Sequence, residues 1–179
     1  MRRLAFAAVT SALLACAPAG EAGDGGAANC PPAPPYGTAV GAVAGDLAFA
    51  GCDGAPVRLH DLCGRVALVV SYYGWCASCS YYARLGDTLA RDYGARGLAA
   101  LVVIVEDATH QPATAATCAE VRTALGLGVP TALDPAHGLE AYGDTDLVMV
   151  LDRGGQIVFQ RQGPDPAAVT TAIEAALAE

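Results

Sequence analysis

The chain has 179 residues, a length typical of one domain with short extensions, and 54% of them are apolar against 16% charged, which excludes a disordered polyelectrolyte. The ten basic residues are all arginine and are outnumbered by eighteen acidic ones, for a net charge of −8. Without a run of positive charge, the composition argues against nucleic acid as a partner, because phosphate contacts need cations.

The first sixteen residues have the pattern of an export signal. Two arginines follow the initial Met, and residues 4–14 carry no charge, about half the length that a membrane-spanning helix needs. The stretch ends in Leu13-Leu14-Ala15-Cys16, which resembles the lipobox of bacterial lipoproteins. This resemblance implies cleavage of the signal peptide 1–15, lipidation of Cys16 and a place in the cell envelope, on the periplasmic or extracytoplasmic side. An ordinary signal peptide with a chance cysteine is the alternative.

Residues 16–37 are predicted to form a flexible tether between this anchor and a folded domain at 38–179. Glycines and small residues lead into the run Cys30-Pro31-Pro32-Ala33-Pro34-Pro35. Such a composition buries little surface and stays extended or mobile.

Strand and helix patterns alternate in the rest of the chain. Short apolar runs at 47–49 and 57–59 flank a Gly-Cys-Asp-Gly turn and predict a hairpin. The apolar run 66–70 predicts a strand buried on both faces, and apolar residues spaced by three or four from Cys79 predict a helix. The later elements are a buried strand at 98–105, a helix at about 113–125, an extended piece at 128–134, a hairpin with strands at 147–151 and 156–159, and a last helix from Asp165 to about Leu177. This order predicts a three-layer α/β sandwich.

The motif Trp75-Cys76-Ala77-Ser78-Cys79 stands between a predicted buried strand and a helix. At the first turn of a helix, free backbone N–H groups and the helix dipole favour a thiolate, so Cys76 is expected to be the exposed nucleophile. Cys79, one turn further along, is expected to be the more buried thiol that resolves a mixed disulfide. A purely structural disulfide and half of a metal site are the alternatives.

From about Gly41 to its end, the sequence resembles the thioredoxin-fold redoxins of the extracytoplasmic thiol–disulfide oxidoreductase type (TlpA-like). The matching motifs are residues 57–64, 74–79, 129–134 with 141–143, and 147–155. The resemblance implies a thioredoxin-like sandwich with an N-terminal hairpin extension and an inserted βα element. It also implies a redox-active Cys76–Cys79 disulfide that needs no cofactor and no metal.

One position departs from the pattern of this family. Its members carry a cis-proline directly before the strand that ends in Leu-x-Asp-x-x-Gly, against the two sulfurs, and that position here is Asp146. A residue other than proline normally has a trans peptide bond. A carboxylate close to Cys76 would also disfavour its thiolate.

Six cysteines remain beside Cys16, and they allow several pairings. If Cys76 pairs with Cys79, we expect Cys52 to pair with Cys63, because these two flank the short hairpin. Cys30 and Cys118 are then left to pair with each other, or Cys118 is a buried thiol.

Two further residues are candidates for a supporting role beside Asp146. Trp75 belongs to the motif itself, and Glu106 follows the second buried strand. The carboxyl ends of parallel strands gather at the edge of the sheet where Cys76 is expected, so Glu106 or its neighbour Asp107 could pass a proton there. Solvation of a loop is the simpler role for both acids.

The sequence therefore predicts a membrane-tethered thiol–disulfide oxidoreductase that acts on protein thiols or disulfides outside the cytosol, with an unidentified redox partner. A copper-binding metal carrier of redoxin type is one alternative. A non-catalytic protein that keeps the fold is the other, because Asp146 replaces the cis-proline.

Overall fold

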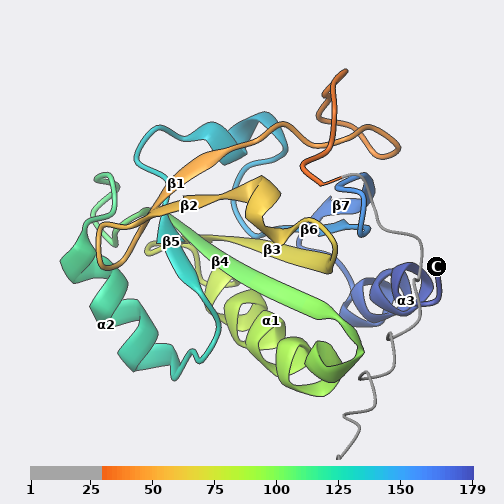
Figure 1. Cartoon of the computed structure of the whole chain (residues 1–179). Coiled ribbons are helices and arrows are strands. Elements are labelled where there is room, and N and C mark those ends of the chain that lie inside the picture. Colours follow the sequence, from red (N-terminus) through yellow and green to blue (C-terminus); the bar gives the residue numbers. More distant parts are fainter. Residues whose placement is uncertain (1–29) are drawn as a thin grey trace, which may run out of the picture.

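A computed structural model describes residues 30–179, so the expected signal peptide 1–15, the expected lipidation site Cys16 and residues 16–29 of the expected tether lie outside the described residues (Figure 1). The strands are β1 (Ala48–Gly51), β2 (Pro56–Arg58), β3 (Val66–Tyr73), β4 (Leu98–Glu106), β5 (Thr131–Leu133), β6 (Leu147–Leu151) and β7 (Ile157–Gln162). The α-helices are α1 (Cys79–Tyr93), α2 (Ala115–Leu125) and α3 (Pro166–Leu177), and the 3₁₀ helices are η1 (Leu59–Leu62), η2 (Gly94–Arg96) and η3 (Gly138–Ala141). Each predicted element is present in chain order.

The strands form one mixed sheet in the order β2-β1-β5-β4-β3-β6-β7. The neighbours β3, β4 and β5 are parallel, as expected for strands joined by helices, whereas β1, β6 and β7 pair antiparallel. Every residue of β3 is buried, because apolar side chains fill both of its faces. The register of β3 on β4 slips after Tyr72, so that Tyr73 lies opposite Glu106. This slip brings the end of β4 beside the residues that follow β3.

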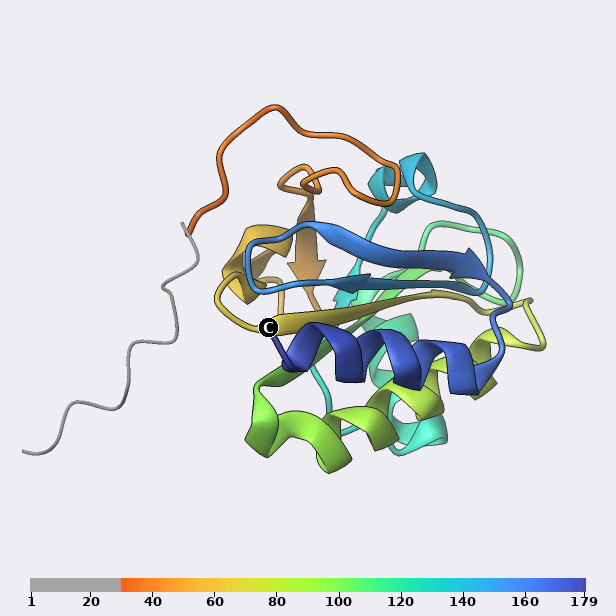
Figure 2. The ribbon, with the colours of Figure 1, turned by 90° about the vertical axis from the view of Figure 1, so that its right-hand side faces the viewer.

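The sheet separates two apolar layers. Figure 2 shows the α-helices together on one side of the sheet and the N-terminal part of the described chain on the other. The side chains of Val66, Leu68 and Val70 belong to the layer under α1, α2 and α3, while Ala67 and Val69 belong to the opposite one. Side chains of η1, η3 and the chain around β1 pack on that opposite layer. They are Ala44, Phe49, Leu59, Leu139 and Tyr142. The expected three-layer sandwich is therefore confirmed, with β1–β2 as the hairpin extension and α2–β5 as the inserted element.

Local signals set the ends of the helices. The carboxylate of Asp165 accepts the N–H of Ala167 at 3.1 Å, and Pro166 occupies the first turn of α3. Helix α2 ends at Gly126, which has a φ of +66°. No helix within residues 30–179 is long and apolar enough to cross a membrane.

The two disulfides outside the motif are not the expected ones. The structure joins Cys30 to Cys63 and Cys52 to Cys118, with Cα–Cα distances of 5.7 and 5.6 Å, so the pairings Cys52–Cys63 and Cys30–Cys118 are wrong. Cys52 packs against the helix-side layer, which contains Cys118. After β2 the chain passes to the other layer, and there the Cys63 sulfur lies 3.5 Å from the carbonyl oxygen of Arg153. Cys52 and Cys63 therefore flank the hairpin in sequence but serve opposite faces of the sheet.

The Cys30–Cys63 bond also changes the expected boundary of the domain. It attaches residues 30–37, which were expected to belong to the flexible tether, to the chain after η1. The Tyr36 hydroxyl donates to the carbonyl of Pro32 at 3.1 Å, and Tyr36 forms a β-bridge with Val43. Residues 30–37 are thus part of the folded unit and not of a free tether.

Candidate active site

The two motif cysteines lie at the junction of β3 and α1. Cys76 is half-buried, whereas Cys79, the first residue of α1, is fully buried. They form a disulfide with a Cα–Cα distance of 5.4 Å, and the backbone N–H of Cys79 donates to the Cys76 sulfur at 3.2 Å. A partner can therefore reach Cys76 more easily than Cys79, and an N–H group is already directed at the sulfur on which a thiolate charge would develop.

A glycine allows the loop after β4 to approach the motif. A Cβ atom on Gly74 would lie 2.5 Å from the backbone nitrogen of Ala108 and 2.6 Å from the carbonyl carbon of Asp107. The N–H of Gly74 donates to the carbonyl of Glu106 at 2.9 Å. Only glycine fits this close contact of two backbones, which brings residues 106–110 beside the motif.

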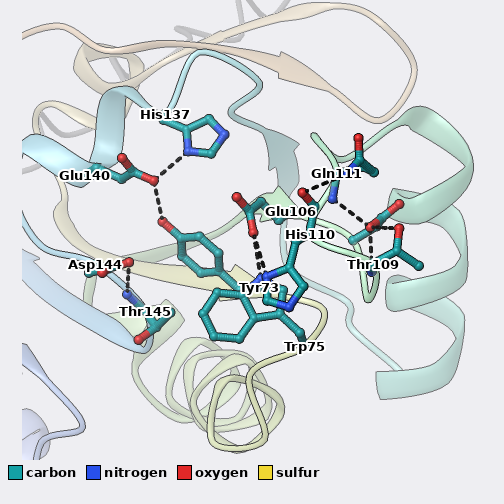
Figure 3. A network of polar contacts seen from close by, with 11 residues as sticks. Tyr73, Trp75, Glu106, Thr109, His110, Gln111, His137, Glu140, Asp144 and Thr145 are labelled. Carbon is teal, nitrogen blue, oxygen red and sulfur yellow. Dashed lines mark hydrogen bonds and ion pairs between the residues drawn. The ribbon is translucent and has the colours of Figure 1, made fainter.

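Glu106 holds the ring of Trp75. The indole Nε1 of Trp75 donates to Glu106 Oε2 at 2.6 Å, and the ring of His110 stacks on the indole with 4.6 Å between centroids (Figure 3). His110 Nδ1 also lies 3.7 Å from the same carboxylate oxygen. The sequence placed Trp75 and Glu106 near each other but gave no sign of His110. The contacts make Glu106 a support for the indole, and a proton-carrying role for it stays a prediction.

Asp107, the other acid after β4, organises its own loop. Its Oδ1 accepts the N–H of Gln111 at 3.0 Å, and the N–H and the hydroxyl of Thr109 at 2.7 and 2.8 Å. The hydrogen bond from Gln111, followed by those from Thr109, holds the pKa of Asp107 below its ordinary value. These contacts agree with a role in the loop.

A second polar group lies on the other side of Tyr73. The Tyr73 hydroxyl donates to Glu140 Oε1 at 3.3 Å, His137 Nδ1 binds the same oxygen, and the Tyr73 ring packs edge-on against Trp75 (Figure 3). Burial, with the charge of Glu140 as the next cause, raises the pKa of Tyr73 well above its ordinary value. Tyr73 therefore stays neutral and links η3 to the motif.

The contact of His137 with Glu140 predicts a pH-dependent stability. The hydrogen bond that His137 donates to the Glu140 carboxylate raises the pKa of His137 above its ordinary value of 6.5. A histidine with a raised folded pKa stabilises the fold fully below its unfolded pKa, and this contribution is lost as the pH rises through the folded pKa. His137→Asn, which tolerates the observed φ of +55°, should therefore lower the free energy of unfolding more at about pH 5.5 than at about pH 8.5. Urea unfolding at both pH values measures this, and an equal loss at both would contradict it.

Asp146 lies directly before β6, facing the motif from a neighbouring loop. Its peptide bond with Thr145 is trans, and its φ of +48° is one that Asp adopts more readily than most residues. Asp146 Oδ2 accepts the hydroxyl proton of Ser78 at 2.8 Å, and Ser78 Oγ lies 3.5 Å from the Cys76 sulfur. The structure thus places Asp146, proposed from the sequence as a supporting residue, one side chain away from Cys76.

Ser78 is another residue that the sequence analysis missed. It stands between the two cysteines, and a hydroxyl at that position is the signal that could have drawn attention to it. Within residues 30–179 the structure shows no group of three or more His, Cys, Asp or Glu side chains that could hold a metal ion.

Comparisons with known proteins agree with this geometry. The family model described as Redoxin matches residues 37–177. A Chlorobium tepidum structure, provisionally described as thiol:disulfide interchange protein DsbE, aligns with a TM-score of 0.67 and 25% identity over 78% of this chain and 98% of that one. A provisionally described protein disulfide isomerase from Bacteroides thetaiotaomicron aligns with a TM-score of 0.66 and 21% identity over 80% and 93% of the two chains. An uncharacterised conserved protein from Geobacillus kaustophilus aligns with a TM-score of 0.68 and 21% identity over 79% and 83%. A search of curated proteins gave no match.

Proposed function

The chain belongs to the redoxin family and has a thioredoxin-like fold, and on this basis we propose that it is a thiol–disulfide oxidoreductase that exchanges disulfides with other proteins through Cys76 and Cys79. Family and fold support a redox function in general. The finer assignment is carried by one observation, the disulfide between a half-buried Cys76 and a buried Cys79 at the start of α1.

The proposed reaction uses the asymmetry of this pair. In the reduced protein the Cys76 thiolate attacks one sulfur of a partner disulfide, and the other partner sulfur leaves as a thiolate. The N–H of Cys79 and the N-terminus of α1 stabilise charge on the Cys76 sulfur. The Cys79 thiolate then attacks the Cys76 sulfur, which restores the internal disulfide and releases the second partner sulfur. In this direction two electrons pass from the cysteine pair to the partner, and the same steps in reverse oxidise a partner dithiol.

The surface around Cys76 supports a protein as the partner. Two large aromatic side chains near the motif are exposed, Trp75 by 40% and Tyr81 by 52%. A pocket of about 420 Å³ lies beside the motif loop, between Gly74, the loop 107–109 and α2. Exposed aromatic rings are common where proteins recognise other polypeptides.

We place this activity outside the cytosol, with the chain held to a membrane by lipid on Cys16. The N-terminal signal pattern supports this location, and so do the disulfides Cys30–Cys63 and Cys52–Cys118, because structural disulfides persist in oxidising compartments. The partners would then be protein thiols or disulfides of the cell envelope.

A second candidate is a non-catalytic protein that keeps the redoxin fold. The observation that favours it is Asp146, which gives the loop before β6 a left-handed residue and brings a carboxylate close to Cys76.

Insulin reduction distinguishes the two candidates. We expect the wild-type protein to accelerate the precipitation of insulin chains by dithiothreitol, and Cys76→Ser to return the rate to that of dithiothreitol alone. Equal rates for the wild type, the variant and dithiothreitol alone would support the non-catalytic candidate.

A further inference from the structure

The hydroxyl of Ser78 has a single proton, so it can donate one hydrogen bond, and Asp146 is the acceptor. An ionised carboxylate only accepts hydrogen bonds, so the 2.8 Å contact with Asp146 Oδ2 takes the Ser78 proton. Ser78 Oγ lies 3.5 Å from the Cys76 sulfur. Because its proton points to Asp146, the oxygen turns only its lone pairs toward this sulfur. In the oxidised protein this is a packing contact, but in the reduced protein it affects which protonation state of Cys76 is favoured.

The side chain of Ser78 does not cap α1, the helix that it precedes. A serine at this N-cap position usually bonds a backbone N–H of the first turn. Here the side chain makes no such cap bond, and the hydroxyl is directed across to the loop before β6. That bond therefore stabilises the arrangement of Asp146 and the motif, and not α1 itself.

The loop that carries Asp146 is fixed in place. The carbonyl of Asp146 accepts the N–H of Gly163 at 3.2 Å. Buried Ser71 donates to the carbonyl of Asp144 at 3.2 Å and accepts the N–H of Leu147 at 2.9 Å, which holds the two ends of the loop against β3. The Asp146 carboxylate is thus positioned by groups outside the cysteine pair, and reduction of the pair need not displace it.

Reduced Cys76 experiences two opposing influences. The N–H of Cys79 favours a thiolate, whereas the Ser78 lone pairs and the charge of Asp146 favour a thiol that donates its proton to Ser78 Oγ. We propose that Asp146 is a positioning residue that acts through Ser78 to keep reduced Cys76 protonated near neutral pH, and so makes the Cys76–Cys79 couple a reductant of partner disulfides. The inference rests on the proposed function and adds its direction. Strongly oxidising couples owe their potential to a stabilised thiolate in the reduced form, which this arrangement opposes.

Other titratable groups surround the site but have different partners. Glu106 binds Trp75, and Asp144 accepts the N–H of Thr145 at 2.8 Å. On α1, the Tyr82 hydroxyl donates to the carbonyl of Pro164 at 2.9 Å. Burial, followed by the charge of Asp146, raises the pKa of Tyr82.

The remaining titratable groups near the motif also have partners of their own. Tyr73 is bound to Glu140, His110 lies on Trp75, and Asp165 caps α3. Among these groups of the described residues, Asp146 is the one whose contacts lead to the Cys76 sulfur through a hydroxyl.

The pH dependence of Cys76 alkylation by iodoacetamide tests the inference in the reduced full chain. Asp146→Asn removes the charge and supplies an amide that can donate to Ser78 Oγ, which frees the Ser78 proton for the sulfur. We expect the midpoint of the alkylation profile to fall by about one pH unit. The matched control is Asp144→Asn, which makes the same charge change two residues away and should leave the midpoint in place. Asp146→Gly, which tolerates a positive φ, gives the same expectation should the asparagine variant not fold.

Two further measurements identify the route of the effect. In a Ser78→Ala background, Asp146→Asn should shift the midpoint by less than half as much as in the wild type. At about pH 9, where the thiolate predominates, the equilibrium constant with glutathione should move about tenfold in Asp146→Asn, or about 30 mV toward a more oxidising couple.

An unchanged or raised midpoint in Asp146→Asn would overturn the inference, and an undiminished shift in the Ser78→Ala background would overturn the route through Ser78. Neither readout requires a protein partner. A lowered midpoint in a protein that fails to reduce insulin would reject the proposed function and the direction assigned to it, and would keep the effect of Asp146 on Cys76.

Discussion

A Cys79→Ser variant is expected to accumulate a mixed disulfide between Cys76 and its partner and to lose turnover by about a hundredfold or more. Cys79 is fully buried behind Cys76, so it takes no part in the first attack but supplies the sulfur that ends the mixed disulfide. Without that sulfur, the adduct lasts until an external thiol removes it. Incubation of the reduced variant with a peptide disulfide, followed by intact mass measurement, should show one peptide for each chain.

The matched control for this trap is Cys76→Ser, which keeps a thiol at the buried position. It should form no adduct under the same conditions, because the exposed sulfur is absent. Equal adduct formation by the two variants would contradict the assignment of Cys76 as the nucleophile. Full turnover by Cys79→Ser would contradict the role of Cys79.

Removal of the Cys52–Cys118 disulfide is expected to lower the free energy of unfolding by about 4 kcal/mol. The bond joins residues 66 positions apart, so it restricts a long stretch of the unfolded chain. It also fastens the inserted helix α2, which carries buried Cys118, to the turn of the N-terminal hairpin. Urea unfolding of Cys52→Ala/Cys118→Ala, followed through the fluorescence of the single Trp75, measures the loss.

Cys30→Ala/Cys63→Ala is the control for this result. Its bond closes a shorter loop of 33 positions, so the expected loss is somewhat smaller. Neither double variant should change the alkylation profile of Cys76. A loss below about 1 kcal/mol for Cys52→Ala/Cys118→Ala would contradict the structural role of that bond.

The sequence predicts the arrangement of β3, the motif and α1 because each of these depends on local pattern. The apolar run of β3, the spacing from Cys79 and the turn before β7 each identify an element without reference to the rest of the chain. The position of Asp146 follows in the same way, since it directly precedes a strand with a recognisable end.

The disulfide pairings could not be predicted, because they depend on which face of the sheet each segment covers. Cys52 and Cys63 lie only eleven positions apart, but the chain changes layers between them. Sequence distance therefore favoured the wrong pair. The Cys30–Cys63 bond was missed for a related reason, because a segment rich in Pro and Gly gives no sign of where it packs.

The contacts around the motif depend on finer details. The register slip that sets Tyr73 opposite Glu106 is a property of the paired strands and not of either sequence alone. The link from Asp146 to Ser78 joins residues 68 positions apart and also needs the positive φ of Asp146. Such contacts follow from tertiary structure, whereas the sequence pattern identifies only elements and motifs.

The most direct test of this account is the redox titration of the oxidised full chain in dithiothreitol buffers, with alkylation and mass measurement of each cysteine. We predict that Cys76 and Cys79 open together under mild reduction of the native protein, while Cys30–Cys63 and Cys52–Cys118 stay closed. A Cys76–Cys79 bond that remains closed in every buffer, or opens only when the other two open, would contradict a redox role for this pair.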